Sequence, residues 1–199
     1  SHGGVWECPD LFPLTVTGTS SSKWVMLVSI NPGGPNGGSA TQYFTGEFDG
    51  HKFIPDDKAE KWMDQGTDNY AGVTWSGIPE QDGRRILIGW MSNWNYATVV
   101  PSSSWRSAMT IPRVLTLNEM NGGFFLASTP VTEITNLRAD SLNVLQHGNG
   151  KTLNFITKND DQGLNRSEID LDFITTRSDT VGITFENELS ERLVIGYSA

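Results

Sequence analysis

The chain has 199 residues, which is enough for one or two domains with a hydrophobic core. Its 23 acidic and 14 basic residues give a formal charge of -9, which repels phosphate backbones and anionic lipid headgroups. Nucleic acid and membranes are therefore not expected as partners, and the apolar runs at residues 24–28 and 86–91 are too short to span a bilayer.

The first candidate functional segment is residues 6–11, Trp-Glu-Cys-Pro-Asp-Leu, which reads as an extended strand. Because neighbouring side chains of a strand point to opposite faces, Trp6 and Cys8 share one face and Glu7 projects from the other. A carboxyl group presented in this way could donate a proton as a general acid, and an ordinary surface glutamate is the alternative. The same alternation predicts that Asp10 points to the face opposite Glu7.

A second strand is predicted at residues 23–30, where residues that suit a pleated sheet are apolar on both faces. It ends at residues 31–38, because two prolines and four glycines exclude helix and strand there. This loop is either a rim element of a site or a plain connector. Residues 41–48 alternate as a third strand, and an Asp-Gly turn predicts a hairpin with residues 51–54.

Strands continue to recur after short turns through the first 120 residues. They are predicted at residues 69–75, 84–91 and 111–117. No window of twelve or more residues in this part has the i, i+3, i+4 spacing of an amphipathic helix. We therefore predict an all-β domain for residues 1–120.

The pattern changes after residue 120. Residues 121–150 have no clear period and are predicted to form a linker. Residues 151–199 are predicted to form part of a β-sandwich with four strands, at 152–157, 168–175, 181–186 and 192–197. Four strands with two open edges are few for an independent domain, so a partner that covers the edges is expected.

Cysteine and histidine counts limit metal and redox chemistry. Cys8 is the single cysteine, so no disulfide can form within the chain. The three histidines do not have the spacing of metal ligands, and we expect no zinc site and no other cofactor. A glycosylation sequon at Asn165 is weak support for secretion, to the cell exterior, the cell wall or the periplasm.

Four ordered stretches of the chain resemble glycoside hydrolase family 32, the invertases, inulinases and levanases that act on β-fructofuranosides. The stretches are residues 6–11, 29–33 with 42–50, 68–71 and 89–97. Their order and spacing are similar to the yeast and fungal branch of that family. The resemblance implies a five-bladed β-propeller with an axial site, followed by a linker and a β-sandwich, and residues 1–120 would form its C-terminal blades.

The resemblance implies a role for two residues at the centre of the site. In this family the glutamate of the Glu-Cys pair is the general acid/base, and this role transfers to Glu7. The tryptophan of the Gly-Trp-Met segment shapes the pocket for the terminal fructose, and this role transfers to Trp90. A position in the core of a blade is the alternative for Trp90.

Four further residues are expected around the substrate. Asn31 and Gln42 would lie on the leaving-group side, Asp68 would support the pocket as a nearby carboxylate, and Trp94 lies either at the rim or in the core. These assignments also follow from the resemblance, with the exception of Trp94, which shares a face with Trp90 by alternation.

The chain departs from the family in one large respect. The Trp-Met-Asn-Asp-Pro motif of the nucleophile and the Arg-Asp-Pro motif of the second aspartate, which normally precede the Glu-Cys pair, are not in these 199 residues. A retaining glycosidase needs two carboxyl groups about 5–5.5 Å apart. Asp64, Asp68 and Asp82 are candidates by position alone, although solvated turns and structural hydrogen bonds are the commoner roles of such residues. A complementary chain or a preceding segment is therefore expected to supply the nucleophile.

These observations predict a retaining glycoside hydrolase that releases terminal fructose from sucrose, inulin or levan, with this chain inactive alone. The expected partners are a fructose-containing saccharide and a complementary chain or N-terminal segment that bears the nucleophilic aspartate. A homo-oligomer is a further possibility. The alternative is a non-catalytic carbohydrate-binding or structural β-module.

Overall fold

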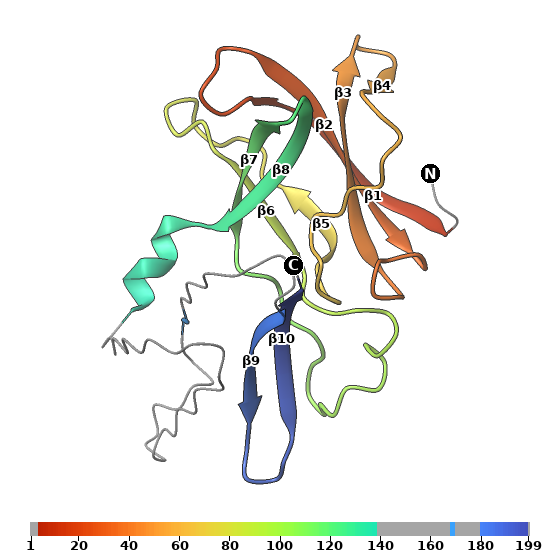
Figure 1. Ribbon diagram of the computed structural model, residues 1–199, viewed down its shortest axis with the longest axis vertical. Helices are drawn as coiled ribbons and strands as arrows, with labels where there is room; N and C mark the ends of the chain where they lie inside the picture. Colours follow the sequence, from red (N-terminus) through yellow and green to blue (C-terminus); the bar gives the residue numbers. More distant parts are fainter. Residues whose placement is uncertain (1–3, 139–167, 170–179, 199) are drawn as a thin grey trace. The chain divides into compact units, whose positions relative to one another are not determined.

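A computed structural model describes residues 4–138, 168–169 and 180–198 (Figure 1). The chain divides into two compact units, Ser1–Ser141 and Leu142–Ala199. In the described residues the secondary structure is almost entirely β, as the sequence predicts. No helix in these ranges is long and apolar enough to cross a membrane.

The first sheet is a four-stranded antiparallel meander in the order β1-β2-β3-β4, red to orange in Figure 1. Its strands are β1 (Val5–Thr15), β2 (Ser22–Asn31), β3 (Ala40–Phe48) and β4 (Phe53–Pro55). The predicted hairpin between β3 and β4 is confirmed. Its turn is closed by the Asp49 carboxylate, which accepts hydrogen bonds from the backbone N–H groups of His51 and Lys52 at 2.8 and 2.7 Å.

The second sheet is also a four-stranded antiparallel meander, in the order β5-β6-β7-β8. Its strands are β5 (Tyr70–Thr74), β6 (Arg85–Trp90), β7 (Arg113–Met120) and β8 (Gly123–Pro130). Strand β8 occupies residues that the sequence assigned to the linker. It forms because Asn121 and Gly122 both have positive φ, 53° and 77°, which makes a tight two-residue hairpin turn.

The core of the first unit lies between the two sheets. Val25 and Leu27 of β2 are fully buried, and they pack with Leu87 and Leu117 from the second sheet. Each such side chain stabilises the fold by roughly 1.5–3 kcal/mol when it leaves water. The sheets are also joined through their backbone, because the Thr17 N–H donates to the Leu117 carbonyl at 2.8 Å.

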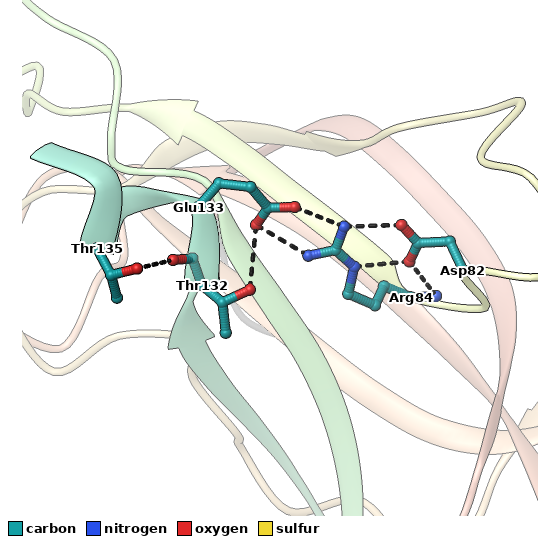
Figure 2. A network of polar contacts seen from close by, with 5 residues as sticks. All are labelled: Asp82, Arg84, Thr132, Glu133 and Thr135. Carbon is teal, nitrogen blue, oxygen red and sulfur yellow. Dashed lines mark hydrogen bonds and ion pairs between the residues drawn. The ribbon is translucent and has the colours of Figure 1, made fainter.

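A 3₁₀ helix, η1 (Thr132–Leu137), follows β8 and is tied to the turn between β5 and β6. Figure 2 shows the contact, in which the Arg84 guanidinium donates to Asp82 at 2.6 Å and to Glu133 at 2.8 Å. Arg84 lowers the pKa of Glu133 to about 2. The ion pairs hold the end of the first unit against its second sheet.

In the second unit the structure describes one antiparallel hairpin, of β9 (Thr180–Glu186) and β10 (Arg192–Ser198). These strands confirm the predictions at residues 181–186 and 192–197. The predicted strand at 152–157 lies outside the described residues, as does all but residues 168–169 of the strand predicted at 168–175. The β-sandwich stays a prediction.

Candidate active site

The position of Glu7 is set by a β-bulge in β1. Glu7 pairs with Ser29 and Asp10 pairs with Leu27, so three steps along β1 match two along β2. The extra residue lies at the turn of the chain around Cys8, whose φ is 46°. Because Ser29 and Leu27 share one face of β2, Glu7 and Asp10 also share a face. The prediction that Asp10 points away from Glu7 is therefore wrong, because strict alternation does not hold across a bulge.

Both carboxylates reach β5 on this shared face, but they are held differently. Asp10 accepts hydrogen bonds from the backbone N–H and the hydroxyl of Thr74, at 2.8 and 2.7 Å, which ties β1 to β5. Glu7 accepts one hydrogen bond through Oε2, from the hydroxyl of Tyr70, and its side chain is exposed. Asp10 is thus a structural link, and Glu7 is a carboxylate oriented by one neighbour and open to solvent.

Tyr70 connects Glu7 to the tryptophans of the site. It is only 3% exposed, and burial followed by its bond to Glu7 raises its pKa well above the ordinary value. It therefore remains a protonated donor across the physiological range. Tyr70 pairs with Trp90 across the sheet, with ring centroids 6.2 Å apart, and the Trp90 and Trp94 rings are 5.0 Å apart. Glu7, Tyr70, Trp90 and Trp94 form a continuous series, which we call the aromatic line.

The two tryptophans of the aromatic line differ in exposure. Trp90 closes β6 and is half-buried, whereas Trp94 lies in the following segment and is 50% exposed. Each therefore presents part of an aromatic ring that a sugar could contact. The structure thus brings together three residues that the sequence predicts. The role of Tyr70 was missed, although it lies within the Asp-Asn-Tyr-Ala stretch.

Asp68 lies two residues before Tyr70 and is half-buried. It accepts a hydrogen bond from the Tyr96 hydroxyl, and burial, with the nearby Asp64 carboxylate, raises its pKa above the ordinary range. Asp64 itself is paired with Arg113 at 2.9 Å. Asp64 and Asp82 are both engaged by arginines, which favours structural roles for them.

Asn93 organises the loops around the aromatic line and was also missed from the sequence. It is 1% exposed, and its amide nitrogen donates to the carbonyls of Ser39 and Thr67 at 3.1 and 2.6 Å. Its Oδ1 accepts from the Asn95 N–H at 2.9 Å. Gly38 has a φ of 66°, and a Cβ there would overlap the Asn93 side chain. Asn93 therefore fixes Trp94 against two loops that are distant in sequence.

Asn31 and Gln42 lie differently with respect to Glu7. Asn31 closes β2, follows Ser29 on the same face in the register, and is half-buried. Gln42 pairs with Val28, on the other face of the sheet from Glu7, and is 1% exposed. Its Oε1 has no hydrogen-bond partner in the part of the chain that the structure describes. The structure does not bring Gln42 to the aromatic line.

The described residues of the site do not form a set of metal ligands. Among the described residues, no group of three or more His, Cys, Asp or Glu side chains is placed to hold a metal ion. The chemistry of the described site is that of the Glu7 and Asp68 carboxylates, hydroxyl groups and aromatic rings.

Comparison with known proteins identifies relatives of this chain. Residues 1–130 match the family model "Glycosyl hydrolases family 32 N-terminal domain". The chain is 52% identical to a levanase from Bacillus subtilis (strain 168) over 144 residues, which is 71% of this chain and 21% of the levanase. It is 38% identical to an invertase from Wickerhamomyces anomalus, over 98% of this chain and 36% of the invertase. The similarity thus includes a bacterial relative as well as the expected branch.

Solved structures match the same part of the chain. An exo-inulinase from Aspergillus awamori is 43% identical with a TM-score of 0.60, over 64% of this chain and 26% of that chain. A fructofuranosidase from Schwanniomyces occidentalis complexed with fructose is 40% identical with a TM-score of 0.58, over 63% and 25%. The sheets match part of the β-propeller of these enzymes and do not close on themselves within the described residues. The chain spans 21% to 36% of its curated relatives, and it belongs to glycoside hydrolase family 32.

Proposed function

We propose that this chain supplies the general acid/base, Glu7, of a retaining β-fructofuranosidase that releases terminal fructose from sucrose, inulin or levan. The observation that carries the proposal is the exposed carboxylate of Glu7, oriented by buried Tyr70 at one end of the aromatic line. The names of the relatives, which are levanases, exo-inulinases and invertases, support the substrate class.

The proposed reaction uses Glu7 twice. Glu7 first protonates the leaving oxygen while a second carboxylate attacks the anomeric carbon of the fructosyl unit. The ionised Glu7 then takes a proton from the water that hydrolyses the covalent intermediate. Since the Tyr70 hydroxyl donates to Oε2 of Glu7, we assign the proton transfer to the other oxygen, Oε1. Trp90 and Trp94 supply apolar ring faces for the sugar.

The nucleophile is proposed to come from a complementary chain or a preceding segment. In family 32 its motif precedes the Glu-Cys pair, and that motif is not in these 199 residues. Within the described part of the chain, Asp10, Asp64 and Asp82 are already held by Thr74, Arg113 and Arg84. Because some relatives are named extracellular exo-inulinases, the proposed enzyme acts outside the cell.

The test uses a completed enzyme, in which the preceding segment of the Bacillus subtilis levanase is fused to the start of this chain. Glu7→Gln should lower kcat for sucrose by about 10²–10⁴-fold, the usual contribution of general acid/base catalysis. The matched control is Glu119→Gln, which changes an exposed glutamate of β7. Wild-type turnover by the folded Glu7→Gln variant would exclude the assignment.

A substrate with a fluoride leaving group separates loss of the acid from loss of the fold. Fructosyl fluoride needs no proton to leave, and azide needs no general base to attack. Azide should therefore restore turnover of fructosyl fluoride by Glu7→Gln, with fructosyl azide as the product. A variant that azide fails to rescue would have lost more than proton transfer.

The second candidate function is a carbohydrate-binding module without catalysis, which the half-exposed ring of Trp94 favours. Incubation of the 199-residue chain alone with sucrose and inulin discriminates between the catalytic function and the binding module. Release of fructose would contradict the need for a second segment. Binding of inulin without hydrolysis by either the chain or the completed enzyme would favour the module.

A further inference from the structure

Three polar residues lie next to one another across the first sheet, on the face that meets β5. Glu7 of β1 pairs with Ser29 of β2, and Ser29 pairs with Thr41 of β3, so the three occupy the same level of neighbouring strands. Cross-strand partners of this kind point to the same face. We call Glu7, Ser29 and Thr41 the polar row. Ser29 and Thr41 are 1% and 3% exposed, so their hydroxyls are enclosed by the protein.

Ser29 and Thr41 each hold one chain neighbour of Tyr70, at the start of the strand drawn in yellow in Figure 1. The Oγ of Ser29 accepts a hydrogen bond from the Ala71 N–H at 3.0 Å. The Oγ1 of Thr41 donates to the Asn69 carbonyl at 3.1 Å. These two bonds therefore fix the backbone on either side of Tyr70, whose hydroxyl donates to the third member of the polar row.

The backbone held in this way has an uncommon conformation. Asn69 and Ala71 have φ angles of 87° and 51°, in the left-handed region that residues other than glycine seldom adopt. The pairing of β5 with β6 also shifts register between Tyr70 and Val73. Backbone strain persists only where surrounding contacts hold it, and it is concentrated at functional sites. The hydroxyls of the polar row supply such contacts at residues 69 and 71.

We propose that Ser29 and Thr41 are positioning residues that act on the acid/base through Tyr70. Their hydroxyls hold residues 69 and 71 in the left-handed conformation, and this conformation directs the Tyr70 hydroxyl onto Glu7. The inference rests on the proposed function, because it concerns the orientation of Glu7 as acid/base. Ser29 and Thr41 are almost fully buried, so a substrate does not reach them. Their loss should therefore slow proton transfer and leave substrate binding unchanged.

The first test measures kcat and KM for sucrose in the completed enzyme. Thr41→Val should lower kcat about fivefold and leave KM within about twofold, because it removes the hydroxyl and keeps the branched shape of the side chain. Thr41→Ser keeps the hydroxyl and should stay within about twofold of wild type in both constants. The matched control is Thr45→Val. Thr45 is a buried threonine on the same face of β3, and its hydroxyl has no partner among the described residues. Equal losses in Thr41→Val and Thr45→Val would overturn the proposal.

A double-mutant cycle tests whether Ser29 acts through Tyr70. Ser29→Ala should lower kcat for sucrose about fivefold in the completed enzyme, but less than about twofold in Tyr70→Phe, which has no hydroxyl left to direct. Ala71→Gly should restore part of the loss in Ser29→Ala, because glycine adopts positive φ without strain. Additive losses from Ser29→Ala and Tyr70→Phe, or no recovery with Ala71→Gly, would show a general structural role and overturn the proposal.

A measurement on the 199-residue chain alone separates this inference from the proposed function. The chain is produced with tyrosine isotope-labelled at Cζ, whose NMR signal responds to the hydrogen bond of the hydroxyl, and Tyr70→Phe identifies the Tyr70 signal. Ser29→Ala should shift this signal, whereas Thr45→Val should not. If Glu7→Gln in the completed enzyme keeps wild-type turnover but Ser29→Ala still shifts the signal, the proposed function fails while the control of Tyr70 by Ser29 stands. An unshifted Tyr70 signal in Ser29→Ala would reject the inference.

Discussion

A single hydroxyl group orients the carboxylate on which the proposed chemistry depends. Tyr70 is buried, and burial raises its pKa, so it donates to Glu7 at any pH at which a glycosidase works. A hydrogen bond that fixes one oxygen of a carboxylate also fixes the direction of the other. In the proposed reaction Tyr70 would act on the substrate only through Glu7, and we therefore regard it as a positioning residue.

Tyr70→Phe in the completed enzyme should lower kcat for sucrose about tenfold and leave KM within twofold, because it frees Glu7 without removing it. Hydrolysis of fructosyl fluoride, measured in azide, should change much less. Tyr43→Phe, which removes the hydroxyl of another buried tyrosine, is the control. If Tyr70→Phe lowers the turnover of sucrose and of fructosyl fluoride equally, Tyr70 has a structural role instead.

Loops around the aromatic line are held by close packing against Asn93, and Gly38 is where this packing is tightest. Its φ is 66°, and a Cβ would overlap the Asn93 side chain. Gly38→Ala should therefore lower the free energy of unfolding by more than Gly18→Ala, in denaturant titrations of the 199-residue chain.

Gly18 is a matched control because its φ is 77° but nothing lies within 4 Å of an added Cβ. Both variants carry the strain of a left-handed alanine, which is roughly 1–2 kcal/mol. The difference between them isolates the clash with Asn93. Equal destabilisation of the two variants would mean that the loop at residues 31–38 shifts to accommodate the added Cβ without any loss in the free energy of unfolding.

The contact between η1 and the β5–β6 turn is expected to depend on pH. Arg84 lowers the pKa of Glu133 from its ordinary value of 4.5 to about 2. A carboxylate whose pKa falls on folding contributes stability above its unfolded pKa and loses it as the pH falls through the folded pKa. The contact should therefore be complete above pH 4.5 and lost towards pH 2.

This prediction can be checked by following the side-chain carboxyl signal of Glu133 in an NMR pH titration of the chain. Arg84→Gln should return the titration midpoint of Glu133 towards 4.5. The control is Glu119, an exposed glutamate on β7. A Glu133 midpoint near 4.5 in the wild-type chain would contradict the ion pair of Figure 2.

At the scale of the elements, alternation and turn residues predict most strands of the first unit. Strands β2 and β3 confirm the predictions within one residue at each end. Strand β8 was missed although Asn121-Gly122 is a strong hairpin signal, because the apolar stretch after it is short. The bulge at Cys8 could not be read from the pattern, because it depends on how β1 pairs with β2.

The site was less predictable than the strands because its contacts join distant segments. Glu7 and the tryptophans could be found from their motifs, but Tyr70 meets Glu7 only when β5 lies against β1. Asn93 likewise bonds to Ser39 and Thr67, and no local pattern encodes these partners. Gln42 was placed near the substrate by resemblance, and the described residues bury it on the other face of its sheet.

At the scale of the molecule, the first unit matches the family 32 N-terminal domain and has a well-formed core. Its two sheets share a cluster of buried apolar side chains and match family 32 structures over about two thirds of the chain. The proposed acid/base is therefore carried by a unit that can hold its geometry, while the opposing carboxylate is proposed to come from elsewhere.

The backbone hydrogen bond from Thr17 to Leu117 has a consequence for how the first unit folds during synthesis. The two residues are a hundred positions apart, and the adjacent Val16 is almost fully buried. During synthesis, residues 16 and 17 at the end of β1 lack their partner until Leu117 of β7 has left the ribosome. Pairings between such distant positions slow folding, so refolding of this chain should be slower than that of a helical protein of equal size. A nascent chain stopped before residue 113 would lack Leu117, the partner of both Val16 and Thr17.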